Sequence, residues 1–238
     1  MTPLEILSPL VPLESLKIRH DHVFSEILGD NYAIIGFKGE DVKDAEVIDI
    51  GANVGMFTML CHAHGAKTII PIEANPHTYN ELISNLINIP TVKYSLNMAI
   101  FDGCLMFINF TDSGTESRIE SDGKIKVPCM SLEEALSRCQ GEDIVMKMDI
   151  EGAEYDVIPA CSKSALRRCK RIFLETHVMR DNGNDKPGHT SVFLKEYLSL
   201  CGFKVAHYSR IFQWIWDNGK VKSCTPIPNF EMLKMERV

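Results

Sequence analysis

Short apolar runs alternate with stretches of helical spacing along most of the chain. The runs have the length and the β-branched content of buried strands, and they cover residues 47–50, 68–73, 91–98, 143–149, 171–176, 203–208 and 212–216. The intervening patterns predict helices that begin at residue 56 and near residue 154, and others over residues 76–88, 131–139 and 191–201. This alternation predicts an α/β fold with a doubly wound, mostly parallel seven-stranded sheet, right-handed crossovers and an antiparallel late strand.

The chain before residue 47 departs from this pattern. Residues 1–46 contain three prolines and a mixed polar segment, with a helix expected over residues 13–28 and a strand over residues 32–36. We expect them to form an N-terminal cap segment ahead of a single domain that covers residues 47–238. Inside that domain, the alternation between residues 103 and 128 predicts a short antiparallel excursion from the main sheet.

Composition and charge fit one globular domain and narrow its partners. The chain has 238 residues, of which 45% are hydrophobic and 24% are charged, which suffices for a sizeable core. The formal net charge of −7 argues against a nucleic-acid groove as the main surface, because phosphate binding depends on clustered Lys and Arg. The one basic cluster, residues 167–171, is typical of a charged helix end and the loop after it.

The cysteines and the apolar runs indicate the cellular compartment of the protein. Eight cysteines lie far apart without a C-x-x-C motif, which favours buried, reduced thiols. No apolar run approaches the roughly eighteen residues that a membrane span needs, and residues 1–4 lack the basic start of an export signal. We therefore expect a cytoplasmic protein that has no membrane partner.

The most informative stretch is the turn after the first apolar run, D-I-G-A-N-V-G at residues 49–55. Two glycines bracket Asn53, and asparagine is the next-best residue after glycine for a positive φ, so a tight turn can form. Such a turn lets backbone N–H groups approach a nucleotide-like ligand, which lies over the carboxyl end of the first strand. The spacing departs from the dinucleotide pattern G-x-G-x-x-G, which disfavours NAD as that ligand.

Glu73 closes the second strand, 22 residues beyond Gly51, where an acid accepts hydrogen bonds from ribose hydroxyls. This second match strengthens the prediction of a nucleoside ligand. If the third strand ends level with its neighbours, Ala99 lies beside the base of that ligand.

Three motifs stand in a fixed order along the chain. They are D-I-G-A-N-V-G at residues 49–55, I-E-A-N-P at 72–76, and K-M-D-I-E-G-A-E at 147–154 followed by L-E-T-H at 174–177. Together they resemble the FkbM family of S-adenosylmethionine-dependent methyltransferases, over roughly residues 46 to 178. The resemblance implies a class I methyltransferase fold and transfer of a methyl group, usually to a hydroxyl oxygen of a sugar or secondary metabolite. The identity of the acceptor does not carry over.

The resemblance also implies which residues bind the cofactor. The methionine end would be held by residues of the glycine turn, and the ribose by Glu73. The whole predicted cofactor-binding set is Asp49, Gly51, Ala52, Asn53, Gly55, Glu73, Ala74 and Ala99.

Methyl transfer from a sulfonium is an in-line displacement that needs alignment and removal of the acceptor's proton. The acid–base residues near the carboxyl ends of the fourth and fifth strands are Asp149, Glu151, Glu154, Glu175 and His177. His177 has an ordinary pKa near neutrality, which suits a base, and Glu175 beside it could orient the ring or raise its basicity. Asp149 is the competing candidate for the base. The predicted catalytic residues are therefore Asp149, His177 and Glu175.

Several alternatives share parts of this pattern. A NAD-dependent oxidoreductase would share Gly51 and Glu73, and a non-catalytic binding module could keep the nucleoside pocket. Carboxylates of residues 149–154 could hold a hard cation such as Mg²⁺, but this is a minority interpretation and we predict no metal. His62 and His64 are two residues apart on a helix and point to different faces, so they are expected at a solvated helix end. The predicted partner is a small-molecule acceptor that carries a hydroxyl group.

Overall fold

The computed structural model describes residues 37–102, 106–111, 118–119, 123–177, 180–181, 184–186, 188–217 and 220–238. Most of the predicted N-terminal cap segment lies outside these residues. The part that is described contains a short 3-10 helix, η1 (Gly39–Asp41), ahead of the first strand. In the described part of the chain, none of the helices is long and apolar enough to cross a bilayer.

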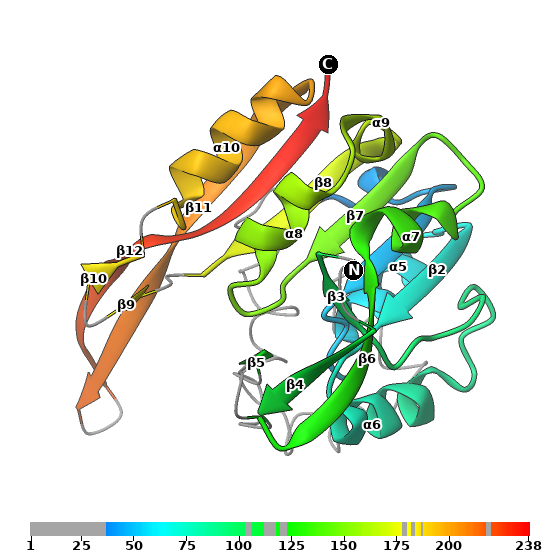
Figure 1. The fold of residues 1–238 in the computed structure, drawn as a ribbon, viewed down its shortest axis with the longest axis horizontal. Coiled ribbons are helices and arrows are strands. Elements are labelled where there is room, and N and C mark those ends of the chain that lie inside the picture. Colours follow the sequence, from blue (N-terminus) through cyan, green and yellow to red (C-terminus); the bar gives the residue numbers. More distant parts are fainter. Residues whose placement is uncertain are drawn as a thin grey trace.

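The main sheet has six strands in the order β11-β12-β8-β7-β1-β2 (Figure 1). They are β1 (Glu46–Ile50), β2 (Thr68–Ile72), β7 (Ile144–Met148), β8 (Cys169–Thr176), β11 (Phe203–Asp217) and β12 (Lys220–Arg237). β1 is parallel to β2 and β7, and β7 is parallel to β8. β12 is antiparallel to both of its neighbours, β8 and β11. The predicted doubly wound, mostly parallel sheet with an antiparallel late strand is confirmed.

The predicted third strand, residues 91–98, was wrong in its extent. It is reduced to two isolated parallel bridges to β2, at Val92 and Leu96. Beyond Leu96 the side-chain amide of Asn97 bonds the two carbonyl oxygens that follow β2. Strand pairing therefore stops there, and the sheet has six strands and a bridged edge segment.

The two predicted late strands, residues 203–208 and 212–216, form one strand, β11, with a register shift between Arg210 and Phe212. Its antiparallel partner β12 was not predicted. Residues 220–237 contain prolines and charged residues that interrupt the alternation by which strands are recognised.

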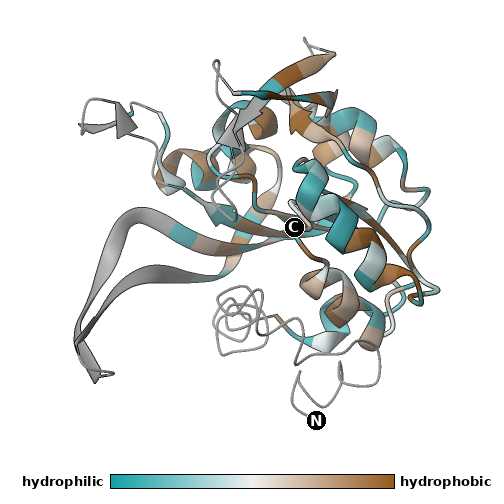
Figure 2. Ribbon diagram, turned by 90° about the horizontal axis from the view of Figure 1, so that it is seen from below, coloured by the Kyte–Doolittle hydropathy of each residue, from teal (hydrophilic) through white to brown (hydrophobic). Residues whose placement is uncertain are grey.

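Helices cover both faces of the sheet (Figure 1). They are α5 (Met56–Ala63), α6 (Pro76–Leu86), α7 (Leu132–Ser137), α8 (Glu154–Ala160), α9 (Lys163–Leu166) and α10 (Ser191–Leu200). Asn75 caps α6 by accepting from the His77 N–H, and Ser131 starts α7 with the capping box expected from its sequence. The four-residue helix α9 was not predicted. Figure 2 shows both hydrophilic and hydrophobic residues along the helices, and apolar residues of all six helices belong to the two main core clusters.

Alternate residues of the central strands face opposite helix layers. In β1, Ile48 and Ile50 belong to the apolar cluster formed with α7, α8, α9 and α10, while Val47 belongs to the cluster formed with α5 and α6. Because successive side chains of a strand point to opposite faces, Asp49 faces the α5 layer like Val47. Lys147 of β7 pairs with Asp49 in the strand register and faces the same layer.

A second, four-stranded sheet lies beside the main one, in the order β3-β6-β4-β5. Its strands are β3 (Ala99–Phe101), β4 (Phe107–Thr111), β5 (Arg118–Ile119) and β6 (Ile125–Ser131). β4 and β6 form the predicted antiparallel excursion, although most of its polar tip lies outside the described residues. A two-residue pair, β9 (Arg180–Asp181) and β10 (Asn184–Asp185), precedes α10.

Six cysteines are buried, as the sequence predicted. Burial raises the pKa of the Cys139 thiol to about 11 and that of Cys161 to about 12. Cys104 and Cys224 complete the eight in the sequence, and no thiol contact is described for either.

Candidate functional site

The predicted glycine turn joins β1 to α5 with three residues of positive φ. Gly51, Asn53 and Gly55 have φ values of 73°, 50° and 92°. A Cβ atom at position 51 would lie 1.8 Å from the carbonyl oxygen of Asp149. Glycine is required at this position because the tips of β1 and β7 touch here, and Asn53 adopts the left-handed conformation that the sequence predicted.

The N–H groups of this turn are occupied within the protein. Those of Gly51 and Ala52 donate to the Ile72 carbonyl at the end of β2. The Asn53 N–H donates to Glu73, and the side chain of Asn53 accepts from the next residue of the turn. The sequence led us to expect these N–H groups to bind a ligand. They instead hold the turn against the end of β2, and so they fix the shape of the turn.

Asp49 is a fully buried acid one residue before the end of β1. Its Oδ2 accepts a 2.7 Å hydrogen bond from the Thr58 hydroxyl of α5. Its Oδ1 has no hydrogen-bond partner in the part of the chain that the structure describes. Burial raises the pKa of the Asp49 carboxyl, although Lys147 and Thr58 act in the opposite direction.

Glu73 occupies the predicted place, directly after β2, and is buried. Its two carboxylate oxygens each accept a 2.8 Å hydrogen bond, from the N–H groups of Asn53 and Asn75. Burial raises its pKa, while these two N–H groups lower it. Each oxygen keeps lone pairs for a further donor. Glu73 thus ties the turn after β1 to the helix start after β2, a contribution that its position in the sequence did not indicate.

The remaining predicted cofactor residues, Ala74 and Ala99, come together although they belong to different sheets. Ala99 begins β3 and is buried in a small apolar cluster with Ile108 and Val127, against which Ala74 packs. Ala74 follows Glu73 in the chain, so this apolar cluster packs against the residue next to the acid.

Lys147 was not predicted as a site residue, yet it contacts both the glycine turn and the acid Asp149 after β7. Its ammonium group donates a 2.6 Å hydrogen bond to the Gly51 carbonyl. The same group lies 3.8 Å from Asp49 Oδ1 and 3.4 Å from Asp149 Oδ2. Burial alone lowers the pKa of Lys147, but the charges of Asp149 and Asp49 outweigh it and raise the value. The signal in the sequence was a lysine inside an apolar run, which needs a partner when buried.

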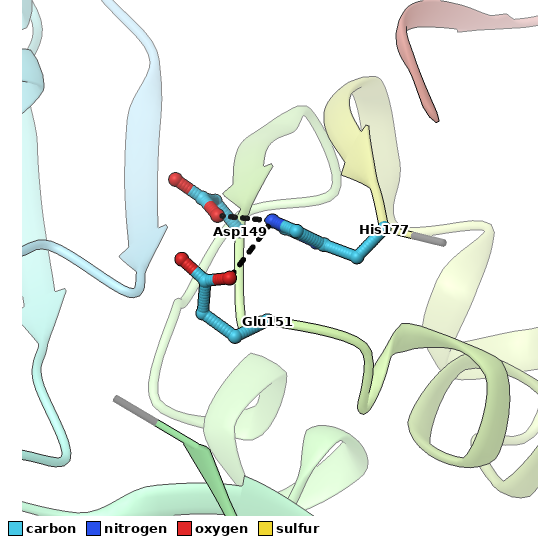
Figure 3. A group of neighbouring side chains, drawn as sticks. All are labelled: Asp149, Glu151 and His177. Atoms are coloured by element: carbon cyan, nitrogen blue, oxygen red, sulfur yellow. Dashed lines mark ion pairs between the residues drawn. The ribbon is translucent and has the colours of Figure 1, made fainter. Parts of the chain in front are cut away.

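His177, the residue after β8, meets acids from the loop that follows β7 (Figure 3). Its Nε2 lies 3.2 Å from Glu151 Oε2 and 3.6 Å from Asp149 Oδ1. Its Nδ1 lies 3.1 Å from Oε1 of Glu154, a fully buried residue at the start of α8. The predicted catalytic residues Asp149 and His177 are therefore neighbours.

The electrostatics of His177 come from several acids. Burial alone lowers the pKa of His177, but the charges of Glu154, Glu175 and Glu151 raise it well above its usual value. Glu175 was expected either to orient the ring or to raise its basicity. The hydrogen bond that orients the ring is accepted by Glu154, and Glu175 contributes through its charge. The role of Glu154 had no signal in the sequence beyond an acid at a helix start.

Two other histidines, His62 and His64, lie at the end of α5, as predicted. The Nδ1 atom of His62 is 2.9 Å from the Thr91 hydroxyl, and His64 makes an edge-on contact with the ring of Phe37. Both have local partners, which agrees with their assignment to a helix end.

Comparisons with known proteins agree with this arrangement. A model of the methyltransferase FkbM domain matches residues 49–205. Precorrin-6y C5,15-methyltransferase of Geobacter metallireducens is 15% identical over 87% of either chain, with a TM-score of 0.50. A candidate RNA methyltransferase of Pyrococcus horikoshii is 16% identical over 91% of this chain and 83% of its own, with a TM-score of 0.47. An S-adenosylmethionine-dependent methyltransferase of Leishmania major is 13% identical over 98% of this chain and 81% of its own, with a TM-score of 0.44.

At 15% identity the Geobacter structure speaks only to the fold, which is that of class I methyltransferases. No curated protein matches the chain. The FkbM match carries more weight, because it begins at Asp49 and includes both the glycine turn and the acids around His177. Since it spans well over half of the chain, the protein belongs to the FkbM family of methyltransferases, and its cofactor is S-adenosylmethionine.

Proposed function

We propose that this methyltransferase transfers the methyl group of S-adenosylmethionine to a hydroxyl oxygen of a small molecule, such as a sugar or a secondary metabolite. The observation that carries the proposal is the contact between the glycine turn and the acids around His177. Lys147 binds the Gly51 carbonyl and lies beside Asp149, so a cofactor held at the turn is close to an acid–base group. Methyl transfer to oxygen needs the methyl donor and an acid–base residue close to the same acceptor atom.

The cofactor-binding residues have separate roles in this proposal. Gly51, Asn53 and Gly55 shape the surface against which the methionine end lies, with Asp49 beneath it. Glu73 accepts from the ribose hydroxyls through its remaining lone pairs. Ala52 lies within the turn, and the apolar surface of Ala74 and Ala99 suits the base of the nucleoside.

The reaction is a displacement in which the sulfur–methyl bond breaks as the oxygen–methyl bond forms, and the acceptor's proton passes to a base. Asp149 and His177 are the two candidates for that base. The geometry favours Asp149, because the His177 Nε2 atom lies between two carboxylates, whose charges favour a proton on that nitrogen. Glu175 and Glu151 add negative charge that favours the protonated imidazole.

Two features favour a small acceptor over a nucleic acid, and a third favours the cytoplasm as the compartment. The formal net charge of −7 opposes a polyanionic substrate, and the loop that carries Asp149 and Glu151 adds acids where such a substrate would enter. Buried free thiols fit a reducing compartment.

Calorimetry with S-adenosylhomocysteine and with NAD tests the cofactor site. We expect saturable heat with S-adenosylhomocysteine and none with NAD, and the reverse result would contradict the proposal. Incubation of the protein with methyl-labelled S-adenosylmethionine and a small-molecule extract then tests the acceptor. The expected product carries the labelled methyl group on an ether oxygen. A labelled methyl group on nitrogen or carbon would refute O-methylation, and label in RNA would refute a small-molecule acceptor. An Asp149→Asn variant that binds S-adenosylhomocysteine is the matched control for background labelling.

A further inference from the structure

The ring of His177 and the acids beside it have the spacing of metal ligands (Figure 3). One donor atom from each of Asp149, Glu151 and His177 lies within 4.8 Å of the others. Ligand atoms about 2.1 Å from a small cation stand about 3 Å apart when they are neighbours in an octahedron. The 3.2 Å and 3.6 Å separations from Nε2 to the two carboxylates are close to that value. A ring nitrogen between two carboxylates holds either a proton or a cation.

The far side of the ring is prepared for ligation. Its Nδ1 lies 3.1 Å from Glu154 Oε1, and that oxygen also accepts a 2.9 Å hydrogen bond from the N–H of Ile150. Glu154 is completely buried and is held by the first turn of α8. A histidine that binds a metal usually donates its other N–H to a carboxylate, which fixes the ring and leaves the opposite nitrogen free for the metal. Glu154 has this position, and it directs Nε2 toward Asp149 and Glu151.

Among the interactions described for this site, acids outnumber basic groups. The acids whose charges act on His177 or Lys147 are Asp49, Asp149, Glu151, Glu154 and Glu175. The groups that oppose them are the Lys147 ammonium and the His177 ring. Two buried carboxylate oxygens, Glu154 Oε2 and Asp49 Oδ1, have no hydrogen-bond partner among the described residues. Buried acids without partners cost free energy, and a bound cation would offset that cost.

We propose that Asp149, Glu151 and His177 bind a hard divalent cation, Mn²⁺ or Mg²⁺, and that Glu154 is the positioning residue for the histidine. Carboxylate oxygens select cations of this class, and Mn²⁺ accepts an imidazole nitrogen as well. This site departs from our prediction, made from the sequence, of no metal. Its use rests on the proposed function, since a cation here would bind the acceptor oxygen and ease the loss of its proton.

Binding of Mn²⁺ alone tests the site without cofactor or acceptor. We expect the full-length protein to remove Mn²⁺ from solution with one saturable site per chain, measured by electron paramagnetic resonance of the free ion, and Mg²⁺ to compete for it. Glu151→Gln and Asp149→Asn should each weaken Mn²⁺ binding by about tenfold or more. The matched control is Glu40→Gln, which removes the same charge from an exposed side chain in η1. It should bind Mn²⁺ like the unaltered protein.

Affinity for S-adenosylhomocysteine shows whether each variant is folded and separates the two proposals. Mn²⁺ that fails to bind, or that binds equally to Glu151→Gln and the unaltered protein, overturns the cation site and leaves His177 as an imidazolium among acids. If S-adenosylhomocysteine still binds in that case, the proposed function stands. If Mn²⁺ binds but S-adenosylhomocysteine does not, the proposed function fails and the cation site stands.

Discussion

Two buried clusters of charged residues lie at opposite ends of the central strands and differ in how well their charges are balanced. Beside η1, Lys234 of β12 contacts both oxygens of the buried Asp41, at 3.1 Å and 2.9 Å. Arg171 of β8 contacts Asp41 at 3.1 Å and Glu236 at 3.2 Å. Two acids meet two bases there. At the carboxyl ends, the acids around Lys147 and His177 outnumber the bases, and two buried oxygens lack partners among the described residues.

We expect such a difference between a cluster that serves only the folded state and one that also binds a ligand. A balanced, hydrogen-bonded cluster can serve the folded state alone, and it joins β8 and β12 to the segment before β1. An unbalanced cluster at the ligand-binding edge of an α/β sheet costs stability, and such a cost is typical of sites that bind something else.

Two single acids at opposite ends of the strands can be compared in the same way. Glu73 after β2 and Glu46 at the start of β1 each accept two backbone N–H groups through their carboxylates. Glu73 holds those of Asn53 and Asn75, and Glu46 holds those of Gln140 and Gly141. The chemistry of the two acids is alike, but only Glu73 lies at the end where the cofactor site is proposed.

The largest expected effect comes from Asp149→Asn. The amide keeps the shape of the side chain but cannot take a proton or supply the same charge, and loss of a general base lowers rates by about 10²- to 10⁴-fold. The measurement is the methyl-transfer rate at saturating S-adenosylmethionine once an acceptor is identified, with His177→Ala measured alongside. Full turnover in both variants, with normal cofactor binding, would place the base elsewhere.

The second-largest expected effect is on stability, and it concerns the balanced cluster around Asp41. Asp41→Ala leaves the buried Lys234 ammonium without its main partner, and breaking a buried ion pair in this way costs about 3–5 kcal/mol of stability. Urea unfolding measures the loss, and S-adenosylhomocysteine affinity of the folded variant should not change. The neighbouring Glu40→Ala, at an exposed position, should alter stability by about 0.5 kcal/mol or less. A large fall in cofactor affinity in Asp41→Ala would show that the two clusters are not separate.

The smallest effect distinguishes the two matched acids. Glu73→Ala should weaken S-adenosylhomocysteine binding by about 1.5–3 kcal/mol, or roughly ten- to a hundredfold, because a charged acceptor for the ribose is lost. Glu46→Ala removes a carboxylate that also accepts from two backbone N–H groups, and it should leave that affinity unchanged. Calorimetry on both variants is the test. Equal affinities in Glu73→Ala and the unaltered protein would remove the ribose role from Glu73.

The turns, helix starts and strand ends discussed here could be predicted from the sequence, because they depend on residues that are neighbours in the chain. The unit of β1, glycine turn and α5 follows from an apolar run, two glycines and an asparagine that tolerates positive φ. The starts of α6 and α7 follow from the Asn75 and Ser131 caps. The positions of Glu73, Asp149 and His177 at strand ends follow from strand length alone.

β12 and the third strand were missed because tertiary contacts decide them. Glu231 and Lys234 are buried in β12, where Lys195 and Asp41 pair with them, so charged residues lie inside a strand. A pattern of apolar and polar positions reports such a segment as exposed. Pairing beyond Leu96 ends because the Asn97 side chain bonds the carbonyl oxygens that follow β2, which the sequence does not reveal.

The sequence by itself determined most of the order of strands and helices up to β11, the glycine turn and the acids at strand ends, since each depends on residues close together in the chain. Only the tertiary structure decided which acids meet. Strand register sets Lys147 beside Asp49, and the parallel pairing of β7 with β8 brings His177 to Asp149, Glu151 and Glu154. Those contacts join residues of different elements. The balance of charge in the site is therefore a property of the fold, because charges interact through space and not along the sequence.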